Sequence, residues 1–279
     1  MKTLLKSPSA AKLYFLTWVV AAFAIPAVGC MKVREIKEKP VHPVFSITEL
    51  ELGSVIETLR PEIKDAILKR PQYFLELVDQ LLQLPADTLI LVDKHNPLPR
   101  DYEPDDLILL AKYDLGVGRN DLKVRRRIMP DLLAMDAAAR VAGIDLIYSS
   151  AYRSWAYQEE VYKKNVRELG QEQADRESAQ PGKSQHQLGT AVDFGSITDN
   201  FALTPSGRWL KAYAWEYGFS LSYPEGMETI TGYRYESWHY RYISRTGTRM
   251  EKEFFAGSQQ YFLEFWKERK DYFKGKLVR

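Results

Sequence analysis

The sequence predicts an α+β fold in which helices and short strands follow one another irregularly. Short runs of β-branched and aromatic residues lie between longer stretches of helical periodicity, without the strict strand–helix–strand alternation of a parallel α/β fold. Of the 279 residues, 45% are hydrophobic and 13% aromatic, which is enough for a packed core. The net charge of +2 is too small to argue for nucleic acid as a partner.

The N-terminal residues resemble an export signal. Three lysines precede an apolar run over 13–28, which is short for a transmembrane helix of about 20 residues. The run ends in Ala27-Val28-Gly29-Cys30, which resembles a bacterial lipobox, whose cysteine is lipidated; the alternative is an uncleaved signal anchor with a buried thiol. We expect a lipoprotein signal peptide over 1–29, a membrane anchor at Cys30 and a location in the cell envelope, on the periplasmic or extracellular face.

Residues 30–43 are polar, contain two prolines and are expected to form a tether. From residue 47 to 84 apolar residues recur at helical spacing, and Pro61 and Pro71 divide this stretch into two or three short helices. We therefore predict a helical N-terminal extension over 44–85, which either caps the domain or binds a partner.

The main domain is expected over 86–267, including a C-terminal helix, with a basic tail over 268–279. Arg153 falls at a predicted junction between a strand and a helix, where side chains often reach a rigidly held site. The expected strands are 88–92, 144–149, 188–194, 219–223 and one around Trp238. The expected helices are 121–142, 156–169, one capped by Thr204 or Ser206 and ending at Tyr217, and 249–274, with 171–183 as a polar loop.

Two short blocks contain the residues of a metal site. Ser184-Gln185-His186-Gln187-Leu188-Gly189-Thr190-Ala191-Val192-Asp193 holds one histidine and one carboxylate, and Glu236-Ser237-Trp238-His239-Tyr240-Arg241-Tyr242 holds a second of each. His186, Asp193 and His239 would supply two neutral imidazoles and one carboxylate, a ligand set that suits zinc. Glu236 would then remain as a general base for a water molecule at the open position.

The alternative is that these are ordinary core and surface residues, and no His-Glu-x-x-His motif supports the metal interpretation. Residues three apart on a regular strand face opposite sides of the sheet. The hypothesis of a shared site therefore predicts an irregular backbone between Glu236 and His239.

The blocks resemble those of a known family. Ser184-x-His186-x-x-Gly189-x-Ala191-x-Asp193 and Glu236-x-Trp238-His239-x-Arg241-Tyr242 resemble the two motifs of the VanY-type D-alanyl-D-alanine carboxypeptidases, peptidase family M15. Tyr152-Arg153-Ser154 with Gln158 is similar to a further family segment, and the likeness covers roughly 89–265. Ala151 and Ser237 depart from the family, which often has Gly and Pro at these positions.

The resemblance implies a small antiparallel sheet flanked by helices, the zinc fold shared by DD-peptidases and Hedgehog domains. It implies one zinc ion per chain, bound by His186, Asp193 and His239, with Glu236 as the catalytic base. Arg153 would bind substrate and stabilise an oxyanion. The substrate pocket would be lined by Ser184, Gln158, Tyr152 and Trp238.

The function implied is a zinc-dependent hydrolase that removes the terminal D-alanine from peptidoglycan stem peptides. An L,D-carboxypeptidase, a dipeptidase and an endopeptidase share the motifs and remain alternatives. From a different class, a peptidoglycan-binding module with a structural zinc would have no need of Glu236. A third alternative is a scaffold whose helices over 44–85 bind a protein partner.

Overall fold

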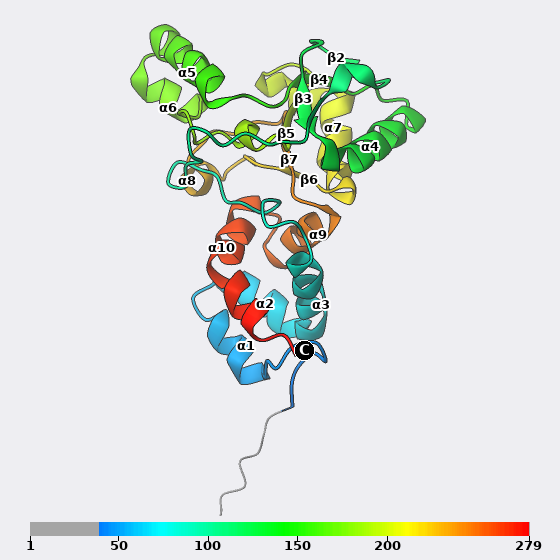
Figure 1. The fold of residues 1–279 in the computed structure, drawn as a ribbon, viewed down its shortest axis with the longest axis vertical. Helices are drawn as coiled ribbons and strands as arrows, with labels where there is room; N and C mark the ends of the chain where they lie inside the picture. The colour runs from blue at the N-terminus through cyan, green and yellow to red at the C-terminus, as the bar shows by residue number, and fades with distance from the viewer. Residues whose placement is uncertain (1–38, 279) are drawn as a thin grey trace, which may run out of the picture. The chain divides into compact units, whose positions relative to one another are not determined.

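The structure, a computed structural model, describes residues 39–278 and is built around a five-stranded sheet in the order β2-β4-β5-β7-β6 (Figure 1). All neighbouring strands are antiparallel except β2 and β4, which pair in parallel. A separate antiparallel pair is formed by β1 and β3. The strands are β1 Leu107–Leu109, β2 Gly116–Val117, β3 Lys123–Arg125, β4 Ile147–Ser150, β5 Ala191–Phe194, β6 Phe219–Leu221 and β7 His239–Tyr242.

Helices occupy most of the remaining chain. They are α1 Glu49–Val55, α2 Pro61–Lys69, α3 Pro71–Leu82, α4 Met129–Val141, α5 Trp155–Leu169, α6 Gln171–Glu177, α7 Pro205–Tyr213, α8 Glu228–Thr231, α9 Arg245–Phe254 and α10 Gln259–Gly275. Among residues 39–278, no helix is long and apolar enough to cross a membrane. The expected signal peptide, Cys30 and the first part of the expected tether lie outside the described residues.

The two faces of the sheet differ in character because side chains alternate along each strand. In β4, a register shift between Tyr148 and Ser150 puts these two side chains on opposite faces. One face is apolar and packs against α4 and α7 through residues such as Tyr148, Val192, Phe194 and Tyr240. The opposite face carries buried polar side chains from the neighbouring strands β4, β5 and β7: Ser150, Asp193, His239 and Arg241. The apolar face forms part of the hydrophobic core, and the polar face carries the side chains that can take part in binding or catalysis.

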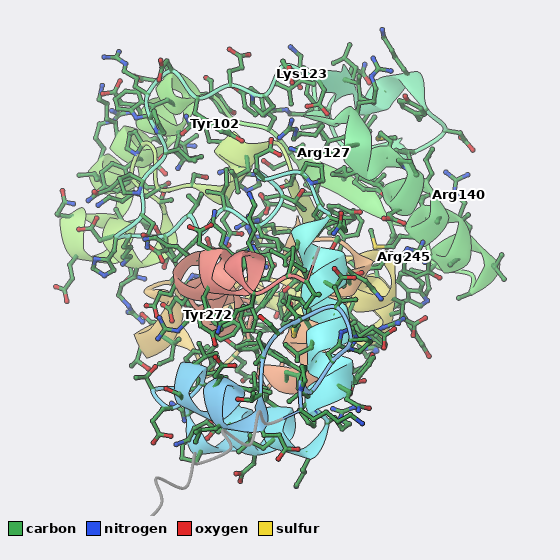
Figure 2. The ribbon with its side chains drawn as sticks, turned by 60° about the horizontal axis from the view of Figure 1, so that its bottom comes forward. Tyr102, Lys123, Arg127, Arg140, Arg245 and Tyr272 are labelled. Carbon is green, nitrogen blue, oxygen red and sulfur yellow. The ribbon has the colours of Figure 1, made fainter. Side chains whose placement is uncertain are left out.

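A second hydrophobic cluster joins the two ends of the described chain. Helices α1 to α3 pack with α9 and α10 around Phe74, which contacts the rings of Phe254, Phe265 and Phe273. Phe45 and Leu277 form an isolated antiparallel bridge that ties these ends together. Figure 2 brings these helices forward, with Tyr272 of α10 labelled. The predicted helices of the N-terminal extension are confirmed, with Pro61 and Pro71 each opening a helix.

Several predicted elements were wrong. Residues 88–92 form no strand; their chain is held instead by Arg241, whose Nη2 donates to the carbonyl oxygens of Ile90 at 2.6 Å and Thr88 at 3.4 Å. Part of the expected loop over 171–183 is helix α6, and the expected helix over 121–142 begins only at Met129, with Pro130 in its first turn.

The single long C-terminal helix that we expected is divided into α9 and α10. Ala256 and Gly257 have positive φ angles of 54° and 69°, which a helix cannot contain. Ser258 then caps α10 by accepting the backbone N–H of Tyr261. After this break, Gln259 at the start of α10 accepts a hydrogen bond from Gln185 at 3.1 Å.

Candidate metal centre

His186 lies on a single turn of 3₁₀ helix, Gln185–Leu188, directly before β5. The hydroxyl of Ser184 caps this turn by accepting the backbone N–H of His186 at 3.3 Å. Gly189 ends the turn in the left-handed conformation, with φ 69°, which favours glycine. The turn thus places the imidazole of His186 above the polar face of the sheet.

Asp193 and His239 are brought together by strand register. Asp193 of β5 is paired directly with His239 of β7 and, on its other side, with Ser150 of β4. Side chains at directly opposed positions of antiparallel strands lie on the same face. The register therefore places Ser150, Asp193 and His239 in one row across three strands.

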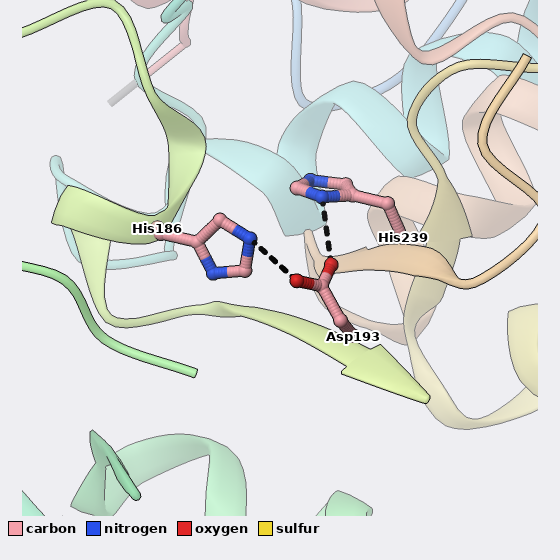
Figure 3. A group of neighbouring side chains, drawn as sticks. All are labelled: His186, Asp193 and His239. Atoms are coloured by element: carbon pink, nitrogen blue, oxygen red, sulfur yellow. Dashed lines mark ion pairs between the residues drawn. The ribbon is translucent and has the colours of Figure 1, made fainter. Parts of the chain in front are cut away.

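The three predicted ligands face one another at short range (Figure 3). His186 Nε2 lies 3.2 Å from Asp193 Oδ2, and His239 Nδ1 lies 3.1 Å from Asp193 Oδ1. One potential ligand atom of each residue lies within 4.8 Å of the others, and all three side chains are buried. A single metal ion could contact all three of these atoms.

The hydrogen bonds around the cluster leave the correct atoms free for a metal. His186 Nδ1 lies 2.7 Å from the carbonyl oxygen of Ala151, so it donates its proton there and leaves Nε2 with a lone pair. His239 Nε2 lies 3.3 Å from Gln185 Oε1, which leaves Nδ1 unprotonated. Asp193 Oδ1 is buried and accepts no hydrogen bond from the described residues. This donor set fits zinc.

Electrostatics favour the same protonation states. Burial, followed by the positive charge of Arg153, lowers the pKa of His186 to about 4. Burial alone would raise the pKa of Asp193, but His186 and His239 bring it well below its usual value. At neutral pH, His186 is therefore a neutral imidazole and Asp193 a carboxylate, as metal ligands must be.

Glu236 lies beside the cluster on an irregular backbone, as predicted. A turn joins it to His239, whose backbone N–H donates to the Glu236 carbonyl oxygen at 3.2 Å. Glu236 Oε2 lies 3.6 Å from His239 Nδ1. Burial, with Asp193 nearby, raises the pKa of Glu236 to about 7, a value suited to both accepting and releasing a proton.

Arg153 is held against the cluster from two sides. Its Nε and Nη2 donate to the hydroxyl of Ser150 at 3.0 and 2.8 Å, and Nη2 also donates to Asp193 Oδ2 at 2.9 Å. Its Nη1 points toward Gln158 Oε1 at 3.5 Å, and Gln158 is itself anchored by donating to the Ala179 carbonyl at 2.7 Å. The guanidinium is therefore fixed next to the three candidate ligands.

A cavity of about 380 Å³ opens over this cluster. Its walls include Arg153, Gln158, Ser184, Glu236 and Trp238, so the structure brings together all but one of the predicted site residues. The exception is Tyr152, which does not line this cavity. Its backbone N–H donates to the backbone carbonyl oxygen of Lys123.

The sequence analysis missed several residues around the cluster. Gln185 contacts His239 from a motif position that can hold any residue. Ala151 contacts His186 through its backbone carbonyl oxygen, which does not depend on the type of residue. Tyr223 is buried, and its ring lies 4.9 Å from that of His239, centre to centre. Gln259 reaches the cluster only through Gln185 and lies far from both motifs in sequence. No local pattern marks these residues, because they come together only in the folded chain.

Comparisons with known proteins identify the same family that the two sequence blocks resemble. Residues 121–245 match the model of the VanY family, described as D-alanyl-D-alanine carboxypeptidase. Over 202 residues the chain is 33% identical to the putative carboxypeptidase YodJ of Bacillus subtilis (strain 168), covering 68% of this chain and 74% of the relative.

Two solved structures are similar to this one. The LD-carboxypeptidase LdcB is 30% identical with a TM-score of 0.58, over 63% of this chain and 86% of that chain. A mutant of the D,D-pentapeptidase VanY from a VanB-type resistance cassette, in complex with Zn(II), is 32% identical with a TM-score of 0.54, over 63% and 99%. The predicted fold and enzyme class are confirmed: the chain belongs to the VanY family of D-alanyl-D-alanine carboxypeptidases.

Proposed function

We propose that this chain is a zinc-dependent carboxypeptidase that removes the terminal D-alanine from peptidoglycan stem peptides. The observation that carries the proposal is the buried group of His186, Asp193 and His239, whose potential ligand atoms lie within 4.8 Å of one another. These three residues would hold one zinc ion, which agrees with the zinc bound by the similar VanY structure. The chain's own family and enzyme class support the hydrolysis of a terminal D-alanyl bond.

Glu236 would move the proton during hydrolysis. Bound zinc supplies a Lewis acid that lowers the pKa of a water molecule toward about 7. Glu236, with a pKa raised to about 7, would accept the proton of the attacking water and then donate it to the leaving amine. Its position 3.6 Å from His239 Nδ1 places it within reach of that water.

Arg153 would stabilise the charge that develops on the oxygen of the scissile carbonyl. Its guanidinium is already oriented by Ser150 and Asp193, so little ordering is needed when substrate binds. Ser184, Gln158 and Trp238 would contact the peptide from the cavity walls. Tyr152 is proposed only as a neighbour of this surface, because it does not line the cavity.

An L,D-carboxypeptidase that trims the tetrapeptide is the second candidate. The similarity to LdcB, an LD-carboxypeptidase, favours it specifically. The residues that we assign to zinc binding and proton transfer would have the same roles in both reactions, so the site does not separate these substrates.

We also propose that the chain is exported and attached to the cell envelope through lipidated Cys30, with 1–29 removed as a signal peptide, 30–43 as a tether and 44–85 as a helical extension of the 86–267 domain. A peptidase acting on the cell wall works outside the cytoplasm, which agrees with this location. Metabolic labelling with a fatty acid tests the anchor: label should enter the wild-type chain and not Cys30→Ser.

Mass spectrometry of two peptides tests the reaction. The zinc-loaded chain is incubated separately with a stem pentapeptide ending in D-Ala-D-Ala and with the tetrapeptide. We expect the pentapeptide to lose one alanine, with activity abolished by a chelator and by Glu236→Gln. Loss from the tetrapeptide alone would move the assignment to L,D-carboxypeptidase. Zinc binding without cleavage of either peptide would contradict a carboxypeptidase and favour an endopeptidase or a peptidoglycan-binding module.

A further inference from the structure

Gln185 is one of three buried polar side chains that are joined in a closed ring of hydrogen bonds. Its Nε2 donates to Gln259 Oε1 at 3.1 Å, Gln259 Nε2 donates to Ser222 Oγ at 3.2 Å, and the Ser222 hydroxyl donates to Gln185 Oε1 at 2.7 Å. All three residues are buried, with exposed fractions of 4%, 2% and 3% for Gln185, Gln259 and Ser222. Each hydrogen bond in the ring therefore orients the next without competition from water.

The ring points one particular atom at His239. Gln185 Oε1, which already accepts the hydroxyl of Ser222, lies 3.3 Å from His239 Nε2. An oxygen at this position requires a proton on Nε2 and leaves the lone pair on Nδ1, which faces Asp193. The reversed ring would turn the amide NH₂ of Gln185 toward His239 and place the imidazole proton on Nδ1, where a metal could not bind.

One member of the ring lies beyond residues 121–245, the part of the chain that matches the family model. Gln259 opens α10, beyond residues 121–245. Ser222 follows β6, and its backbone N–H donates to the carbonyl oxygen of His239 at 3.2 Å. The helical cluster around Phe74 is thereby connected, through the first turn of α10, to a candidate zinc ligand.

We propose that Gln185 is a positioning residue for the metal centre, held in its active orientation by Gln259 and Ser222. It fixes the tautomer and ring orientation of His239, and α10 thus contributes to zinc affinity through Gln185. This inference rests on the proposed role of His239 as a ligand.

Zinc affinity measured by chelator competition tests the proposal on the full chain. Gln185→Met keeps the side-chain length but removes the acceptor, and should weaken zinc binding about 10- to 100-fold. Gln259→Met should weaken it less, because Ser222 still contacts Gln185. Gln260→Met is the matched control: this neighbouring buried amide donates to Asp93 at 2.8 Å and to Glu264, outside the ring, and should leave zinc affinity unchanged.

A conservative variant separates hydrogen bonding from packing. Gln185→Glu restores an acceptor for His239 Nε2 and should recover most of the affinity that Gln185→Met loses. Nitrogen-15 NMR of the histidines, only four in the chain, should show His239 protonated at Nε2 in the metal-free wild type. In Gln185→Met this preference should be lost.

The outcomes distinguish this inference from the proposed function. If the wild type binds no zinc, or if His239→Ala binds it as tightly as the wild type, the proposed ligand set is wrong. If His239→Ala abolishes binding while Gln185→Met and Gln259→Met retain wild-type affinity, only the positioning role is overturned. An equal loss in Gln185→Met and Gln185→Glu would also overturn it, because the acceptor would then not matter.

Discussion

At the scale of single residues, Arg153 is oriented by several hydrogen bonds in the candidate site. Two of its nitrogens share the hydroxyl of Ser150, and one of them also contacts Asp193. Lysine has the same charge but lacks the planar fork that makes these contacts simultaneously. The arrangement predicts that charge alone is insufficient at this position.

Arg153→Lys should therefore reduce kcat/KM by about 100-fold or more, the usual effect of removing one oxyanion donor. Zinc content, measured by metal analysis, should remain at one ion per chain. Arg176→Lys is the control, because Arg176 forms a similar two-point contact with Glu228 on an exposed surface. Full activity in Arg153→Lys would contradict the proposed role.

Glu251 of α9 is a buried acid that takes no part in the proposed chemistry. Its Oε2 is buried without a hydrogen-bond partner among residues 39–278, and burial raises its pKa to about 8. A raised pKa in the folded state means that the protonated form folds more favourably. The stability that protonated Glu251 contributes to the fold is fully present below the unfolded pKa of about 4.5, and it is lost as pH rises through about 8.

We accordingly expect Glu251→Gln, which stays neutral at all pH values, to be more stable than the wild type at pH 8 by roughly 1–3 kcal/mol. The difference should shrink toward pH 4.5. Urea unfolding at several pH values measures it. A wild type that gains stability relative to Glu251→Gln as pH rises would refute this reading of Glu251.

The sequence allowed the residues that make the chemistry to be predicted, but not those that orient them. His186, Asp193, Glu236 and His239 lie in two short blocks whose spacing and residue types indicate a zinc site. Gln185 and Gln259 are 74 positions apart, and they meet only in the folded chain, where Gln259 begins α10. Such partners depend on tertiary structure and have no local signal.

At the scale of elements, the turn Gln185–Leu188 shows how a glycine in a motif supports a ligand. Gly189 has φ 69°, and a Cβ there would lie 3.0 Å from the side chains of both Arg125 and Leu107. Its backbone N–H donates to the carbonyl oxygen of His186 at 3.1 Å. Any other residue would strain the turn that carries His186.

Gly189→Ala should destabilise the fold by about 1–2 kcal/mol, the cost of the left-handed conformation, and should weaken zinc binding as His186 moves. Gly53→Ala is the control. A Cβ at Gly53, inside α1, meets nothing within 4 Å, so alanine should be neutral or stabilising by about 0.5–1 kcal/mol. Chemical denaturation of both variants gives the comparison, and equal stabilities would contradict this account of Gly189.

Predictions of elements succeeded where periodicity and caps agreed. Ser154 caps α5 and Thr204 caps α7, and both helices were predicted within a few residues. The strand predicted over 88–92 does not form, because Arg241 donates hydrogen bonds to the carbonyl oxygens of Thr88 and Ile90 and no partner strand is present among residues 39–278. Hydrophobicity alone predicted the burial of that run but not its conformation.

At the scale of the whole described chain, the sheet and the helical cluster around Phe74 are linked by contacts through α10 and β7. Gln259 bonds to Gln185, Gln260 bonds to Asp93, and Ile243, directly after β7, packs into the cluster of α1 to α3. Unfolding of the helices at both ends of the described residues would therefore break contacts with the sheet. We expect residues 39–278 to unfold as one cooperative unit.

This coupling predicts that zinc stabilises the helical cluster as well as the site. At a zinc concentration about 100 times its Kd, stability should rise by about 2.7 kcal/mol, and a chelator should lower the Tm of a single transition. Phe74→Ala should lower that same Tm, with a cost of about 3–5 kcal/mol for a buried Phe. Thermal unfolding followed by circular dichroism and by tryptophan fluorescence tests this, since both signals should shift together. A second transition that ignores the chelator and responds only to Phe74→Ala would mean that the helical cluster unfolds independently of the sheet.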